Sequence, residues 1–328
     1  MMLKQILPIA AAASLGFSSL AAAEPLPPLP SATCIAPSGP GGGWDFTCRS
    51  VGRTLNQLGL VENPVQTVNM PGAGGGVAYA HIVSKRDTDP TLFAAASTAT
   101  PTRLAQNQFP GMDVSQMHWI GAVGADYGII AVRADSPYSD LKTLMQAIKE
   151  DPRSVSFAGG SAAGGWDHLK ILMTAEKAGV TAPEALKYLS YNNAGDAATQ
   201  VAGGHVDAFS GNISQALGFY KSGDFRILAV LAEERLPGNL DDIPTAQEQG
   251  IDAVAPTWRG FYAPGGISDE QRDWWVAALD QLNHSAEWQA VMAQNGLMPF
   301  AKTGEDFEAF VRQQIEEISR LSRQVGLM

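Results

Sequence analysis

The stretch TCIAPSGPGGGWDFTC, residues 33–48, decides the fold class of this chain. Residues 33–36 form a short apolar run typical of a buried β-strand, and helical periodicity covers residues 44–58. Three consecutive glycines at 41–43 let the backbone between them approach a ligand closely. The N–H groups and the dipole at a helix start attract an anion. The stretch therefore predicts a strand, an anion-binding loop and a helix.

The same succession continues along the chain. Apolar runs predict further strands at 65–69, 91–96, 118–123, 129–132, 154–158, 186–191, 206–210, 226–231 and 260–262. Amphipathic periodicity predicts helices at 77–84, 140–148, 166–178, 196–202, 269–281, 286–295 and 305–325. This alternation is typical of α/β proteins, which bind ligands at the carboxyl ends of their strands. No linker divides the chain, so we predict two lobes connected twice, near residues 124–127 and 232–235.

The loops after the strands carry the candidate site. Residues 159–165 repeat the pattern of the first loop, because the Ser161 hydroxyl and successive backbone amides precede a predicted helix. Asp45 and Asp167 each lie just inside a helix start, where a carboxylate either caps the helix or orders a ligand and water. Trp44 is expected to form a wall of the site. His168 either lines the site or packs against its surroundings.

Charge restricts the class of ligand. The 328 residues include 33 acidic and 22 basic side chains, for a formal net charge of −11, and Lys and Arg do not cluster. This balance argues against nucleic acid as a partner. Arg103 and Arg259 are the basic residues nearest to predicted strand ends, and a solvated or salt-bridged role is predicted for each. We therefore expect an anion site poor in Lys and Arg, in which backbone amides supply the positive potential.

Known catalytic and cofactor patterns are missing from the loops. Residues 159–163 fail the G-x-S-x-G pattern of a nucleophile elbow at its last position, and no phosphate-binding G-x-x-x-x-G-K-[ST] occurs. The five histidines are scattered, without the spacing of a metal site. We predict no catalysis, no cofactor and no metal.

The N-terminus indicates export. A positive start at residues 1–5, an apolar stretch at 6–20 and three alanines before Glu24 predict a signal peptide at residues 1–23; the alternative is an uncleaved anchor. Cys34 and Cys48 are the two cysteines of the chain. In an oxidising compartment they are expected to form a disulfide; the alternative is two separate buried thiols.

Several motifs occur together in one order: CIAP at 34–37 with PGGGxD at 40–45, MPGAG at 70–74, DYGIIAVRADSP at 126–137, RLPG at 235–238, IPTAxEQG at 243–250 and RGFY at 259–262. In these motifs the chain resembles the periplasmic substrate-binding components of tripartite tricarboxylate transporters, and within them the citrate-binding type. The resemblance implies a type II periplasmic binding protein fold with two α/β lobes, a ligand cleft between them and two hinge crossovers. Residues 24–124 and 236–328 would form lobe 1, and residues 125–235 lobe 2.

The resemblance also implies where the ligand binds. In this family one ligand carboxylate is held between the loop at 41–45 and the loop at 161–165, with ordered waters. The second loop has fewer hydroxyl residues than in many relatives, and residues 192–196 are poorer in glycine. The residues expected to contact the ligand are Gly41, Gly42, Gly43, Trp44, Asp45, Ser97, Thr98, Tyr127, Ser161, Ala162, Gly164, Gly165, Asp167 and Asn192.

The function implied is that of a monomeric periplasmic receptor without enzymatic activity. It would capture a small di- or tricarboxylate, citrate first, and deliver it to the large and small membrane subunits of the transporter. The alternative is a carboxylate-binding protein that supplies a periplasmic sensor.

Overall fold

The computed structural model describes residues 26–40, 43–191, 194–324, 326 and 328. The strands in this part of the chain are β1 (Thr33–Ala36), β2 (Gln66–Asn69), β3 (Leu92–Ser97), β4 (Met117–Arg133), β5 (Ser156–Gly159), β6 (Lys187–Ser190), β7 (Ala208–Asn212), β8 (Phe225–Leu231) and β9 (Pro256–Pro264). They are hydrogen-bonded in the order β2-β1-β3-β9-β4-β7-β5-β6, and β8 pairs with β4. The mixed α/β class is confirmed.

The helices lie between these strands and at the C-terminus. They are α1 (Gly43–Gln57), α2 (Gly76–Lys85), α3 (Ala99–Ala105), α4 (Leu141–Glu150), α5 (Trp166–Lys177), α6 (Ala194–Ala202), α7 (Ile213–Ser222), α8 (Asp269–His284), α9 (Ala286–Gln294) and α10 (Gly304–Gln324). Short 3₁₀ turns occupy Ala73–Gly75, Val114–Gln116, Pro183–Ala185 and Gln247–Gln249. Within the described residues, no helix has the length and apolar character needed to span a bilayer.

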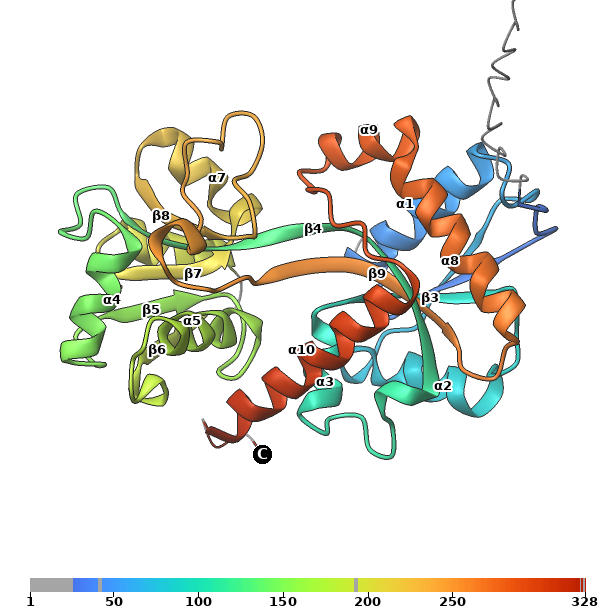
Figure 1. The fold of residues 1–328 in the computed structure, drawn as a ribbon, viewed down its shortest axis with the longest axis horizontal. Coiled ribbons are helices and arrows are strands. Elements are labelled where there is room, and N and C mark those ends of the chain that lie inside the picture. The colour runs from blue at the N-terminus through green and yellow to red at the C-terminus, as the bar shows by residue number, and fades with distance from the viewer. Residues whose placement is uncertain (1–25, 41–42, 192–193, 325, 327) are drawn as a thin grey trace, which may run out of the picture.

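Two lobes are joined by the long strands β4 and β9, which run side by side between them (Figure 1). The first part of β4, Met117–Tyr127, pairs with β9 beside the parallel strands β1, β2 and β3. The last part, Gly128–Arg133, pairs with β7 and β8 in the other lobe. The two-lobed architecture with two crossovers follows from this division of β4.

Each lobe has a core on both faces of its sheet, because successive strand residues point to opposite sides. In the first lobe Cys34, Phe93 and Phe261 belong to one apolar cluster, and their neighbours Ile35, Ala94 and Tyr262 belong to another. In the second lobe Ile130, Phe157 and Ala208 pack on one face, and Ile129, Ala158 and Phe209 pack on the other. Helices cover both faces, so each lobe is a three-layer unit.

The strand β4 replaces two shorter predicted strands. We expected a break at residues 124–128, where two glycines and a polar residue interrupt the apolar pattern. The pairing with β9 continues through this segment, with a register shift between Ala122 and Gly124. Gly124 has φ 152°, and a Cβ there would lie 3.3 Å from Sδ of Met292. The glycine therefore permits a bend and close packing without ending the strand.

The second crossover lies in β9 instead of near residues 232–235. Leu236, Leu240 and Ile243 pack with Phe209 in the second lobe, and Val230 of β8 donates a backbone hydrogen bond to Pro244. Ala255 still belongs to a second-lobe cluster, whereas Trp258 belongs to the first lobe. The segment 236–255, which sequence analysis placed in lobe 1, thus packs on lobe 2, because its apolar side chains fill that lobe's core.

Candidate functional site

The predicted loops follow strands that run in parallel within each lobe. β1, β2 and β3 are parallel in the first lobe, as are β5, β6 and β7 in the second. Their carboxyl ends therefore lie along one edge of each part of the sheet, which is where ligands of α/β proteins bind.

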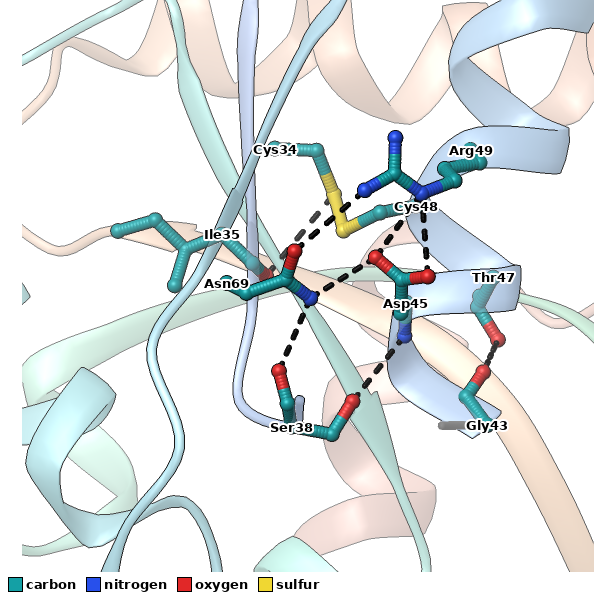
Figure 2. The surroundings of a disulfide bond; sticks show 9 residues. All are labelled: Cys34, Ile35, Ser38, Gly43, Asp45, Thr47, Cys48, Arg49 and Asn69. Atoms are coloured by element: carbon teal, nitrogen blue, oxygen red, sulfur yellow. Dashed lines mark hydrogen bonds and ion pairs between the residues drawn. A yellow bond between two sulfur atoms is a disulfide. The ribbon is translucent and has the colours of Figure 1, made fainter. Parts of the chain in front are cut away.

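The start of α1 is fixed to β1 and β2 by a polar cluster around Asp45 (Figure 2). The buried Asp45 carboxylate accepts hydrogen bonds from Nε of Arg49 at 3.0 Å and from Nδ2 of Asn69 at 2.8 Å. The backbone amide of Asp45 donates to Oγ of Ser38 at 3.2 Å. Two roles were predicted for Asp45, which either caps the helix or orders a ligand and water. These contacts favour the first role, in which Asp45 holds the start of α1 in place.

The disulfide expected between Cys34 and Cys48 is present in the structure and joins β1 to α1 (Figure 2). Both cysteines are completely buried. The bond therefore anchors α1 just after the glycine-rich loop. Two members of that loop, Gly41 and Gly42, lie outside the described residues, as do Asn192 and the predicted signal peptide up to residue 23.

The loop after β3 contacts both α1 and the crossover strand. Nε1 of Trp44 donates to Oγ of Ser97 at 3.2 Å, so the tryptophan lies over the end of β3. Thr98 is fully buried, and its hydroxyl donates to the carbonyl of Pro256 at 3.0 Å and accepts from the amide of Trp258 at 3.2 Å. Thr98 thus holds β9 in place. Trp44 and Ser97 lie together at the carboxyl end of β3.

The loop at 161–165 is held in shape by its own residues. Oγ of Ser161 accepts from the amide of Asp167 at 3.0 Å, and the amide of Gly164 donates to Nδ1 of His168 at 2.9 Å. Within the described residues, the amides of Ser161, Ala162 and Ala163 donate no hydrogen bond. Three consecutive free amides lie beside the start of α5, and backbone amides in this position are donors that an anion can use.

His168 is neutral in this arrangement. Its ring stacks on Tyr188 with centroids 4.5 Å apart, and burial lowers the pKa of His168 to about 4. An unprotonated Nδ1 is required to accept the hydrogen bond from Gly164. The histidine therefore supports the loop from behind.

Lys170, which sequence analysis did not single out, lies under the same loop. It is completely buried, and its ammonium lies 2.8 Å from Oδ1 of Asp167, 2.8 Å from the carbonyl of Gly211 and 2.7 Å from Oδ1 of Asn212. Oδ2 of Asp167 accepts from the amide of Gly160 at 3.1 Å. Asp167 is thus engaged in fixing the loop to α5 and β7. A lysine inside the apolar run from Leu169 to Met173 was the available signal.

A pocket of about 390 Å³ lies between the lobes at this loop. Residues 161–166 form one wall, and Ala99, Thr102, Arg103, Gln106 and Gln108 of the α3 region form the other. Nε2 of Gln106 donates to the carbonyl of Gly164 at 2.8 Å across the lobes. The pocket brings together Ser161, Ala162, Gly164 and Gly165 of the predicted set.

Tyr127 lies apart from that pocket. It lines a separate one of about 350 Å³ with residues 232–237, 298 and 299, and its hydroxyl donates to the carbonyl of Pro299 at 3.4 Å. A third pocket between the lobes, of about 540 Å³, is lined by charges of both signs, including Lys177, Lys302 and Asp306.

Arg259 is half-buried and therefore only partly solvated, and the predicted salt bridge is not formed with any described residue. Its Nε atom is buried without a hydrogen-bond partner, and no described acidic side chain forms an ion pair with it. A Cβ on Gly43 would lie 2.5 Å from Nη1 of Arg259, so the guanidinium lies against the first residue of α1. Arg103 differs, because it is exposed and donates to Oε1 of Gln108. Arg259 therefore places a cation beside the start of α1, although it is not among the residues that line the pocket of about 390 Å³.

The described residues contain no group of His, Cys, Asp and Glu side chains able to hold a metal ion. The acidic side chain that attracts the charge of Arg259 is Asp126. Its carboxylate accepts a hydrogen bond from the backbone amide of Ser214 at 3.3 Å and another from the Ser214 hydroxyl. Burial raises the pKa of Asp126.

Comparison with solved structures supports the fold. A TctC solute-binding protein from Polaromonas superposes with a TM-score of 0.78 at 23% identity, over 89% of this chain and 98% of that chain. Rpa4515 from R. palustris with adipate gives 0.68 at 19% identity, over 90% and 97%. MatC from Rhodopseudomonas palustris with bound malate gives 0.62 at 19% identity, over 90% and 98%.

Sequence comparison identifies the family. The protein BugT of Bordetella pertussis is 26% identical over 322 residues, covering 96% of this chain and 94% of that protein. The family model of the tripartite tricarboxylate transporter family receptors matches residues 51–327, which is most of the chain. The protein therefore belongs to the receptor family of the tripartite tricarboxylate transporters.

Proposed function

We propose that this protein is a periplasmic receptor that captures a small di- or tricarboxylate between its lobes and delivers it to the membrane subunits of a tripartite transporter. Citrate is the first ligand to test. The receptors of this family bind solutes, and the proposal includes no catalytic step.

The observation that carries the proposal is the set of free amides at Ser161, Ala162 and Ala163, next to the pocket of about 390 Å³. A carboxylate accepts hydrogen bonds from such amides and is stabilised by the dipole at the start of α5. The bonds from Gly160 to Asp167 and from Gly164 to His168 hold the loop in position before a ligand arrives. Binding then costs little conformational entropy, because this loop is already ordered.

Two related structures support a carboxylate as the ligand, because Rpa4515 is described with adipate and MatC with malate. The two lobes meet at the pocket through Gln106 and Gly164. A ligand that contacts both walls favours the closed arrangement of the lobes, since only that arrangement provides both sets of contacts.

A thermal-unfolding screen of the exported protein tests the ligand class. The panel is citrate, malate, adipate and succinate, with acetate and a neutral sugar as controls. A ligand at 100 times its Kd adds about 2.7 kcal/mol to the free energy of unfolding. We expect one or more di- or tricarboxylates to raise Tm, and no shift from any of them would contradict the proposal.

A pair of glycine variants tests the place of binding. Gly164 in the loop and Gly179 after α5 have φ values of 79° and 85°. Alanine at either position is strained to a similar extent. Gly164→Ala should weaken the affinity for the carboxylate, whereas Gly179→Ala should lower only the stability. Equal affinities for the two variants would place the ligand elsewhere.

Delivery to the membrane subunits requires a test in cells. Uptake of the labelled carboxylate should fall when the gene for this protein is deleted and return when it is restored. Unchanged uptake with altered gene expression would favour the sensory alternative.

A further inference from the structure

The guanidinium of Arg259 is placed at the junction of the two lobes by strand pairing. Arg259 of β9 lies opposite Ser97 at the end of β3 and opposite Gly124 of β4. Thr257, two residues earlier and on the same face of β9, donates from Oγ1 to Oδ1 of Asn212 in the second lobe at 3.0 Å. This face of β9 thus carries Arg259 between the end of β3 and the end of β7.

Arg259 is half-buried and differs from the buried Lys170 and the half-buried Arg226, because no described residue forms a hydrogen bond or an ion pair with its guanidinium. Lys170 has three oxygen partners, and the guanidinium of Arg226 donates to the carbonyls of Ala134, Ser136 and Tyr138. Nε of Arg259 is equally inaccessible, yet no described residue accepts a hydrogen bond from it. A partly desolvated charge without a partner is costly, and an anionic ligand at the accessible end of the guanidinium would supply that partner.

Asp126 does not provide that partner. Its carboxylate is bonded to the amide and the hydroxyl of Ser214 at the start of α7, and it forms no ion pair with Arg259. Burial lowers the pKa of Arg259 and raises the pKa of Asp126, and the attraction between the two charges offsets only part of each shift.

The start of α1 converges on the same place. Nη1 of Arg259 occupies the space that a side chain at Gly43 would need. The positive end of α1 and the guanidinium repel each other, and an anion between them would offset this repulsion because it attracts both. Glycine at position 43 is thus explained by the position of the arginine, and both features favour negative charge at this point.

We infer that Arg259 binds a carboxylate group of the ligand directly, and that the free amides of residues 161–163 bind a second carboxylate of the same molecule. The planar guanidinium presents two parallel N–H groups that match the two oxygens of a carboxylate. The ligand class is therefore a molecule with at least two carboxylates, and a monocarboxylate satisfies only one of the two sites. This inference rests on the proposed function.

Calorimetry with three variants tests the inference. Arg259→Gln removes the charge, Arg259→Lys keeps the charge without the paired N–H groups, and Arg53→Gln removes a charge from the exposed surface of α1 as the control. The ligands are the dicarboxylate found by the thermal screen and its two monoamides, each of which replaces one carboxylate by a neutral amide.

Arg259→Gln should weaken dicarboxylate binding by about 10- to 100-fold, the range for a hydrogen-bonded charge pair. It should weaken binding of one of the monoamides much less, because that ligand has no charge to pair at Arg259. Arg259→Lys should lie between the wild type and Arg259→Gln, and Arg53→Gln should match the wild type. Unliganded Arg259→Gln should keep or raise the Tm of the wild type.

Three results would overturn the inference. If Arg259→Gln binds the dicarboxylate as tightly as the wild type, the arginine does not contact the ligand. If affinity for the dicarboxylate and for both monoamides falls by the same factor, Arg259 acts only on the structure. If the wild type binds no carboxylate at all, the proposed function fails, and the inference fails with it.

Discussion

The side-chain amide of Gln106, on the first lobe, donates a hydrogen bond of 2.8 Å to the carbonyl oxygen of Gly164 in the second lobe. Gln106 is buried at this contact and also donates to Oγ of Ser322 in α10 at 3.2 Å. The loop proposed to bind the carboxylate is therefore tied to the opposite lobe by a direct contact between protein groups. Nearby, Arg320 of α10 and Glu176 of α5 form an ion pair between the lobes with a shortest distance of 2.6 Å.

Gln106→Ala should shift the lobes toward a more open arrangement. Of the bonds that this variant loses, the one to Gly164 joins the lobes, and its loss, worth about 0.5–1.5 kcal/mol, corresponds to an increase in Kd of roughly 2- to 10-fold. Small-angle scattering of the unliganded protein should show a larger radius of gyration, and calorimetry should show the weaker binding. The control is Gln146→Ala, which removes an exposed glutamine bonded to Glu150 on α4. If both variants match the wild type, the contact does not hold the lobes together.

Acidification should release the loop through His168. The pKa of His168 in the folded protein, about 4, lies below its ordinary value of 6.5. The neutral ring therefore stabilises the folded state above pH 6.5, and this contribution, up to about 3 kcal/mol, is lost as the pH falls toward 4. Urea unfolding should show a smaller loss of stability over this range in His168→Gln than in the wild type.

The exposed His284 provides the control for that experiment. His284→Gln should keep the pH dependence of the wild type. A direct check is the imidazole resonance of His168, which should titrate near pH 4. Titration near pH 6.5 would show that burial does not hold the His168 ring neutral.

Gly43→Val should reduce ligand affinity with little effect on folding. The atom nearest to the new Cβ is the end of a flexible side chain, Nη1 of Arg259, which moves at small cost in stability. Once moved, the guanidinium no longer faces the start of α1. We therefore expect calorimetry to show that the affinity for the ligand falls by about 10-fold or more. Gly39→Val is the matched control in the same loop, because no atom lies within 4 Å of its Cβ position. If Gly43→Val and Gly39→Val bind the ligand with equal affinity, Gly43 is not part of the ligand site.

Removing the disulfide should destabilise the first lobe. The bond between Cys34 and Cys48 closes a loop of about 15 residues, which corresponds to roughly 3 kcal/mol in the chain-entropy model. The double variant Cys34→Ser, Cys48→Ser should unfold at a lower urea concentration than the wild type. Reductant should lower the midpoint of the wild type toward that of the variant and leave the variant unchanged. No difference between the two proteins would mean that the loop is held by other contacts.

Local sequence patterns predicted the fold class and the positions of two loops of the candidate site. The apolar run at 33–36, the glycines and the helical periodicity after them led directly to β1 and α1. The loop at 161–165 was found for the same reason, because strand, glycines and helix follow each other within a few residues. The helices α3 and α7 were missed, although α7 begins with a capping box at Asn212 and Gln215 and ends at Gly223, with φ 81°.

The contacts that sequence analysis missed join residues far apart in the chain. Gln106 reaches Gly164, and Arg259 reaches Gly43, only because β3, β4 and β9 lie beside one another. The packing of residues 236–255 on the second lobe is a similar case. Local periodicity shows that a segment is apolar, but it does not show which lobe the segment covers.

A crystal structure of the protein with the carboxylate selected by the thermal screen would show which residues hold the ligand. We predict one ligand carboxylate within hydrogen-bond distance of the amides of residues 161–163 and another on the guanidinium of Arg259. A ligand in the pocket lined by Lys177, Lys302 and Asp306, or one that contacts a single lobe, would contradict this prediction.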